Sequence, residues 1–132
     1  MRTIKFRGYN PKNKKWIYGH YLMNRGQHFI VQDEIATTWE DYEVEPETIG
    51  QYIGLNDKND TEIYEGDIMR HPDSEQEGVI MWHIHLCHFQ CTWSNMPITA
   101  GDIWYITSNG YEVVGNIYKK ETDVKSNQPE NP

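Results

Sequence analysis

The sequence predicts a mainly β protein with little helix. Its 132 residues are only 37% apolar, but 13% are aromatic, so a few large side chains must supply much of the buried area. Short apolar runs alternate with clusters of Asn, Asp, Gly and Pro, which is typical of strands joined by tight turns. The length suits one compact unit, or two small lobes that share a core.

Three strands are expected in the N-terminal third. The runs "TIKFRGYN" and "WIYGHYL" lie on either side of a polar turn, "NPKNKK", and the run "HFIVQ" follows them. Strand, polar turn and strand is the simplest interpretation of this order. After these strands, Thr38 can cap one helical turn over Trp39 to Tyr42, which Pro46 prevents from extending.

The sequence predicts two hairpins in the middle of the chain. In the first, "QYIGL" and "TEIYEGDIM" flank the Asn/Asp-rich turn "NDKND", as expected for a hairpin. The second comes from an apolar run of sixteen residues, 78–93. Because strands rarely last so long in a small domain, we expect this run to fold back near His85 to His88.

Two further strands are expected near the C-terminus, "GDIWYITS" (101–108) and "YEVVGNIY" (111–118), separated by the turn "SNG". From Lys119 onward the chain has almost no apolar residues, which is typical of a disordered tail.

Charge and composition limit the classes of function. The net charge of −8 opposes general affinity for nucleic acid. Residues 1–25 hold seven basic residues and no acid, whereas residues 27–56 hold seven acids and no Lys or Arg. These two blocks could neutralise each other within one fold or between subunits. The chain has no long apolar run and no signal peptide, so we expect a cytoplasmic protein with two free thiols and no membrane contact.

Three stretches resemble the phage-encoded YopX family: "IKFRGYNPKNKKWIYG", "IGQYIGLNDKNDTEIYEGDIM" and "YEVVGNIY". In the middle stretch Thr48, the run 50–54, Asp57 and the "IYEGDI" of residues 63–68 match nearly unbroken. The resemblance implies a phage or prophage protein with no established biochemical activity. It also implies an N-terminal β-rich portion (1–47) packed beside a small SH3-like β-barrel (48–118), followed by the tail (119–132).

The sequence departs from the family pattern in two places. Asn59-Asp60 stands where the family turn tends to end in Asn-Gly, which should strain any positive φ at Asp60. The stretch "WHIHLCHFQC" stands where the family usually has a plain valine-rich hairpin. This His/Cys cluster is therefore not a family feature.

The cluster could bind a metal. On a strand, His83, His85 and Cys87 share one face, and a bend could bring back Cys91. Zinc suits such a mixed set of ligands. The spacing is not that of a structural zinc knuckle, however, and no second Cys/His pair stands elsewhere in the sequence. The alternative is a hairpin whose Ile80, Trp82, Ile84 and Leu86 face the core while the histidines line the other face or an interface.

Two other groups of residues are candidate sites. Glu65 and Asp67 could be paired carboxylates, but a structural turn built by Gly54, Asp57, Gly66 and Asp67 is the simpler interpretation. No catalytic motif is present, so we do not expect an enzyme. The N-terminus combines basic and aromatic side chains, which suits the binding of single-stranded nucleic acid. The same residues also suit a two-stranded ribbon. The candidate contact residues are Arg7, Lys12, Lys14, Lys15 and Trp16.

The leading hypothesis is a non-enzymatic interaction module without a cofactor. We expect it to form a homo-oligomer, because large aromatic side chains that a small core cannot enclose tend to find partner surfaces. A host or phage protein is a further candidate partner. A metal-binding protein and a single-stranded nucleic-acid binder are the alternatives.

Overall fold

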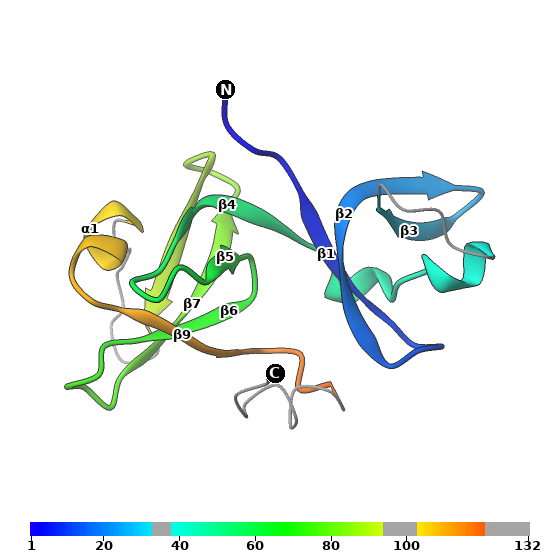
Figure 1. Cartoon of the computed structure of the whole chain (residues 1–132). Coiled ribbons are helices and arrows are strands. Elements are labelled where there is room, and N and C mark those ends of the chain that lie inside the picture. Colours follow the sequence, from blue (N-terminus) through cyan, green and yellow to red (C-terminus); the bar gives the residue numbers. More distant parts are fainter. Residues whose placement is uncertain (33–37, 94–102, 121–132) are drawn as a thin grey trace. The chain divides into compact units, whose positions relative to one another are not determined.

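The computed structural model describes residues 1–32, 38–93 and 103–120 (Figure 1). The chain divides into two compact units. The first is Met1–Tyr52 with Lys119 and Lys120, and the second is Ile53–Tyr118. The boundary lies at Tyr52/Ile53, whereas the division expected from the sequence was at 47/48. No helix in these residues is long and apolar enough to cross a membrane.

The described residues are mainly β, as predicted. Their elements are, in chain order, β1 (Phe6–Asn10), β2 (Lys15–Asn24), β3 (Gln27–Val31), the 3₁₀ turns η1 (Trp39–Asp41) and η2 (Pro46–Thr48), β4 (Gly50–Asn56), β5 (Glu62–Tyr64), β6 (Asp67–Arg70), β7 (Glu77–His83), β8 (His88–Trp93), α1 (Ile103–Ser108) and β9 (Glu112–Asn116).

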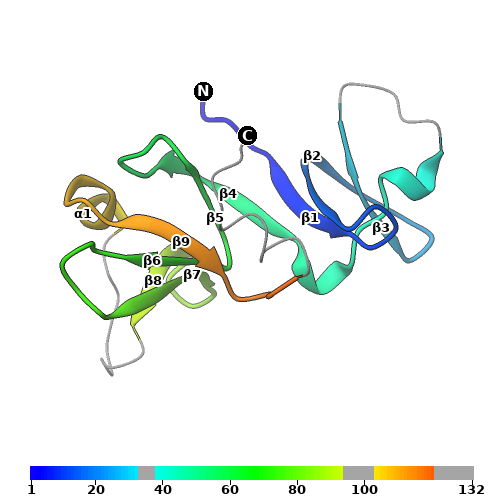
Figure 2. The same cartoon turned by 60° about the horizontal axis from the view of Figure 1, so that its bottom comes forward.

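The strands pair in antiparallel sheets. In the first unit β2 pairs with β3 and β1, and the start of β4 pairs with β1. In the second unit the end of β4 neighbours β5, and four strands follow the order β8-β7-β6-β9 (Figures 1 and 2). The closed barrel expected from the sequence is not formed by the hydrogen bonds among the described strands, because the four-stranded sheet has β8 and β9 as its two edges.

The predicted turns are confirmed in both units. Residues Pro11–Lys14 form the turn between β1 and β2, and η1 is the single helical turn expected after Thr38. The long apolar run folds back at Ile84–Cys87, so that His83 pairs with His88 and Ile80 with Cys91.

The strand predicted at residues 101–108 is wrong over its described part, where Ile103–Ser108 form helix α1. The run of aromatic and β-branched residues favours a strand by local propensity. Tertiary packing decides otherwise: Ile103 and Ile106, three residues apart, both pack into the core, while Tyr105 is exposed. A spacing of three places two residues on one face of a helix and on opposite faces of a strand.

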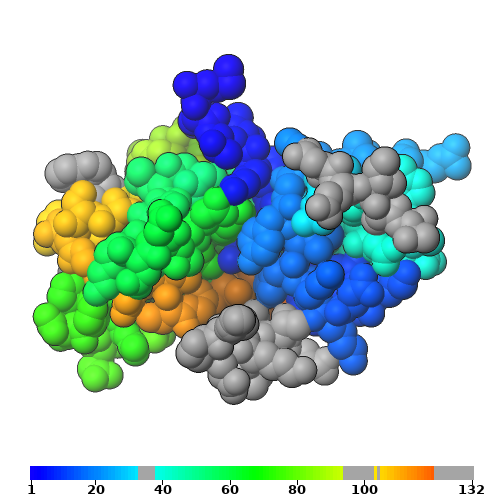
Figure 3. Space-filling view, in the orientation of Figure 1, coloured from blue at the N-terminus to red at the C-terminus, as the bar shows by residue number. Residues whose placement is uncertain are grey.

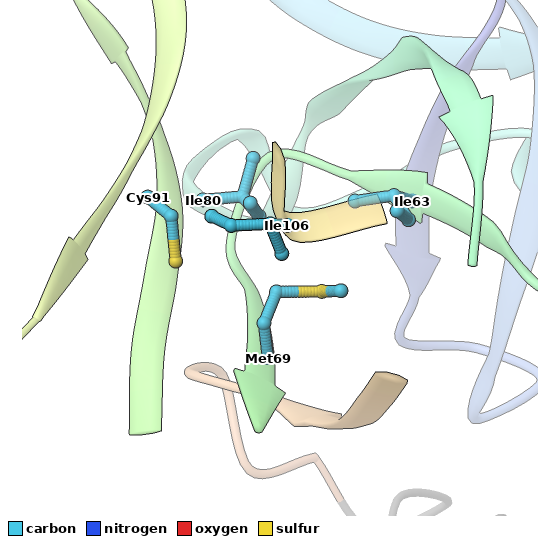
Figure 4. Packing of buried hydrophobic residues seen from close by; sticks show 5 residues of the cluster. All are labelled: Ile63, Met69, Ile80, Cys91 and Ile106. Carbon is cyan, nitrogen blue, oxygen red and sulfur yellow. The ribbon is translucent and has the colours of Figure 1, made fainter. Parts of the chain in front are cut away.

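The second unit has the larger apolar core. Five fully buried side chains form it, one each from β5, β6, β7, β8 and α1: Ile63, Met69, Ile80, Cys91 and Ile106 (Figure 4). The half-buried rings of Trp93 and Tyr111 pack against this cluster with their centroids 5.4 Å apart. Four strands and the helix are thus held by a cluster of only five buried side chains.

The first unit has an even smaller core, made by Ile17, Ile30 and Val44. Buried polar side chains supplement it. The amide of Asn10 donates to the carbonyls of Glu40 (3.0 Å) and Glu43 (2.8 Å), and the Thr48 hydroxyl accepts from the Tyr9 N–H (2.9 Å). Both side chains are fully buried, so they attach the irregular segment after η1 to strand β1.

Gly66, between β5 and β6, adopts a positive φ of 90°. Its N–H donates to the Ile80 carbonyl (2.7 Å), and its carbonyl accepts from the Ile117 N–H (3.0 Å). A Cβ at this position would lie 2.7 Å from a ring carbon of Tyr118. Gly54 has a similar φ of 94° but nothing within 4 Å of such a Cβ.

These two glycines provide a matched pair of variants. Gly54→Ala should lower the free energy of unfolding by about 1–2 kcal/mol, the cost of a Cβ at positive φ. Gly66→Ala should cost about 1 kcal/mol more, because Tyr118 must also move. Urea denaturation followed by Trp fluorescence measures both values. Equal losses would mean that the contact with Tyr118 does not constrain this turn.

Candidate functional site

The histidines of the cluster gather at the far end of the β7–β8 hairpin. The ring centroids of His83 and His85 lie 6.0 Å apart, and those of His83 and His88 lie 6.3 Å apart. His83 Nδ1 accepts the Leu86 N–H (3.1 Å), and the Cys87 N–H donates to the His83 carbonyl (2.8 Å). One nitrogen of His83 therefore helps to close the turn.

The two cysteines lie in different environments, so the predicted ligand set is not brought together. Cys87 is exposed in the turn, whereas Cys91 is fully buried among Ile80, Met69 and the rest of the core (Figure 4). Burial raises the pKa of the Cys91 thiol to about 12, and metals bind the thiolate. Within the described ranges, no group of three or more His, Cys, Asp or Glu side chains is placed to hold a metal ion.

The aromatic side chains of the basic N-terminus stack within the first unit. The Arg7 guanidinium lies over the Trp16 ring, 4.9 Å from its centroid, and Arg7 is buried. Trp16 also makes an edge contact with Tyr9, with centroids 5.6 Å apart. A base would have to compete with these neighbours to stack on Trp16.

Part of the basic block is neutralised by the acidic block within the same chain. Lys12 Nζ lies 3.1 Å from Asp41 Oδ1 and 3.7 Å from Glu40 Oε1. This hydrogen bond lowers the pKa of the Asp41 carboxyl and raises that of Lys12. Lys14 and Lys15 are exposed at the β1–β2 turn.

Asp57 links the β4–β5 turn to strand β9. Its Oδ1 accepts the N–H groups of Asn59 (2.8 Å) and Thr61 (2.9 Å), and its Oδ2 accepts the Val113 N–H (2.9 Å). In the space-filling view this turn (green) lies beside β9 (orange) (Figure 3). Asp60 in the same turn has a φ of 64°, a positive value of the kind that the sequence predicted would be strained in a residue other than Gly.

Asp67 fits the structural interpretation rather than a catalytic pair. Its side chain is buried, and Oδ2 accepts the Tyr64 N–H (2.8 Å). This bond closes the turn through Gly66 at the entrance to β6, which is the role expected from the sequence. Asp67 is therefore directed at the backbone, and Glu65 is half-buried.

The apolar side chains at the end of the β7–β8 hairpin are exposed, whereas the sequence predicted that they face the core. Ile80 faces the core as expected, but Trp82, Ile84 and Leu86 are 47%, 72% and 56% exposed. We call these three residues the hairpin end; Met81, which is 43% exposed, precedes Trp82 on β7 and lies on the opposite face of the strand. The length of the apolar run could have indicated this exposure, because a small core covers only part of a sixteen-residue hairpin.

The importance of Asp57 can be measured directly. Asp57→Ala leaves three backbone N–H groups without their acceptor, so the free energy of unfolding should fall by about 2–4 kcal/mol. The control is Asp73→Ala, since the Asp73 side chain is 90% exposed, and its effect should stay within about 0.5 kcal/mol. Urea titration measures both. A similar small effect at Asp57 would contradict its role as a link between the turn and β9.

The two cysteines should differ in reactivity. Iodoacetamide at pH 8 should alkylate the native protein once, at Cys87, because the raised pKa keeps the buried Cys91 protonated. In denaturant both thiols should react. Mass spectrometry of the alkylated peptides gives the sites, and rapid labelling of native Cys91 would show that its surroundings are open.

Comparison with known proteins agrees with the resemblance seen in the sequence. No curated protein matches the chain. The family described as YopX protein matches residues 5–122, which include all nine strands that the structure describes. With that match covering most of its length, the chain belongs to the YopX family.

Proposed function

We propose that this protein is a phage or prophage accessory protein that acts without catalysis, as a protein interaction module in the cytoplasm of the bacterial host. It binds protein surfaces, including a second copy of itself. The observation that carries this proposal is the exposure of large apolar side chains on hairpins of both units. Contiguous apolar surface is typical of interaction sites.

Each unit contributes such side chains. In the first unit, the β2–β3 hairpin exposes Leu22 and Met23 together with Tyr18 and Tyr21. In the second unit, the hairpin end exposes one indole ring and two aliphatic side chains. Aromatic residues and Met are enriched in protein interfaces, so both hairpins suit contact with another protein.

The basic block (1–25) and the acidic block (27–56) could have paired between subunits, but part of this pairing occurs within one chain. Lys12 already binds Asp41 and Glu40 of its own chain, and Lys120 binds Glu45. The proposal therefore depends on apolar surface rather than on pairing of the charged blocks between subunits.

For the second unit we propose the SH3-like character that the family resemblance implies. Strands β6, β7 and β8 follow one another as a meander, and β9 returns after a short helix to pair with β6. This order supports an SH3-like arrangement of the strands, although a fold by itself does not imply a function.

Neither alternative function gains a specific observation. The buried thiol of Cys91 disfavours the predicted zinc site. For nucleic acid, Arg7 and Trp16 stack on each other and Lys12 binds acidic side chains, so the predicted surface is largely occupied by contacts within the chain.

Self-association is tested by size-exclusion chromatography with light scattering on protein without an affinity tag. The mass should rise above the 15.6 kDa of one chain as the concentration increases, because association through apolar surface obeys mass action. Raising the salt concentration should not weaken it, since the contacts are not ionic. A constant 15.6 kDa over the micromolar range would remove self-association from the proposal.

A further inference from the structure

The core face of the β7–β8 hairpin continues beyond the core. Ile80 and Cys91 are paired across the two strands and are fully buried. The next pair on the same face is Trp82 and Phe89, whose rings meet edge to face with centroids 5.0 Å apart. Trp82 is nevertheless almost half exposed. In Figure 1 the yellow-green turn that joins these strands stands at the end of the hairpin, away from β9.

The hairpin end differs in charge from the rest of the chain. No Asp, Glu, Lys or Arg occurs from Gly78 to Trp93, although charged residues make up 24% of the whole sequence and the net charge is −8. Glu77 stands at the opposite end of the hairpin, where strand β7 begins. Its Oε2 atom lies 3.7 Å from Nη1 of Arg70. The exposed apolar side chains of the hairpin end therefore lie in a stretch of the chain without acidic residues, Lys or Arg.

We infer that the hairpin end is the surface through which two copies of this chain associate, about a two-fold axis that places Trp82, Ile84 and Leu86 of one copy against the same residues of the other. The inference deepens the proposed function by naming the surface that self-association uses. Two chains of charge −8 repel each other, and the repulsion is weakest where both surfaces are uncharged. A two-fold axis lets one patch serve both copies.

The size of the patch sets the strength of the contact. One large aromatic side chain presents about 150–250 Å² when fully exposed, so the three partly exposed side chains make a patch of roughly 300 Å². Two such patches bury about 600 Å² in total, less than the roughly 1,200–2,000 Å² of stable interfaces. The dimer is therefore reversible and forms at high concentration rather than as an obligate assembly.

The test compares polar substitutions on the two hairpins. Ile84→Ser with Leu86→Ser removes exposed apolar area from the hairpin end, and Leu22→Ser with Met23→Ser removes a similar area from the β2–β3 hairpin. All four side chains are exposed, so both variants should fold, which circular dichroism and thermal unfolding verify. Sedimentation velocity over a concentration series gives the dimer dissociation constant.

The hairpin-end variant should dimerise at least about tenfold more weakly than the wild type, and the β2–β3 variant should match the wild type. If the hairpin-end variant dimerises as the wild type does, the inference is overturned while self-association stands. Loss of dimer in the β2–β3 variant alone would overturn it in favour of that surface. A wild type that stays monomeric removes both the inference and the self-association in the proposed function.

A cross-linking experiment tests proximity without changing the apolar residues. Cys87 is exposed in the turn and Cys91 is buried, so a short bismaleimide should link Cys87 of one copy to Cys87 of the other. In the control, Cys87→Ser with Met23→Cys moves the exposed thiol to the β2–β3 hairpin and should give severalfold less linked dimer. Equal yields from the two proteins would contradict the proposed contact.

Discussion

Buried polar side chains that bond to the backbone hold the irregular parts of this protein in place. Both apolar cores are small, with three buried residues in the first unit and five in the second, so packing alone cannot order the connecting segments. Asn10 and Thr48 bond to backbone groups around η1 and η2, and Asp57 and Asp67 do so on either side of β5. Their own desolvation is compensated because the polar atoms that they meet are backbone groups that would otherwise be unsatisfied.

The same small core explains the exposed surface. Helix α1 and strands β5, β6, β7 and β8 enclose the side chains of Ile80 and Cys91, but Trp82, one pair further along the hairpin, remains almost half exposed. A protein with a larger core could bury that pair. Here the apolar side chains of the hairpin extend beyond the elements that pack against Ile80 and Cys91. The apolar surface that stays exposed is available to another molecule.

Local sequence determined most of the architecture. Runs of apolar and aromatic residues with Asn, Asp, Gly and Pro between them marked the strands and turns, including the reversal at Ile84–Cys87. Gly66 and Asp67 could be assigned to a turn because a positive φ and a carboxylate that accepts nearby N–H groups are local properties. The stretches that resemble the family are likewise local, since they span these strands and the turns between them.

The tertiary structure alone decided which side chains of each element are covered, because that depends on what packs against them from distant parts of the chain. It made Ile103–Ser108 a helix against the preference of its residues, since Ile103 and Ile106 had to reach one core. It separated Cys91 from the histidines and placed Arg7 on Trp16. It left Trp82 exposed, because the alternation of a strand shows which face is apolar but not where the cover over that face ends.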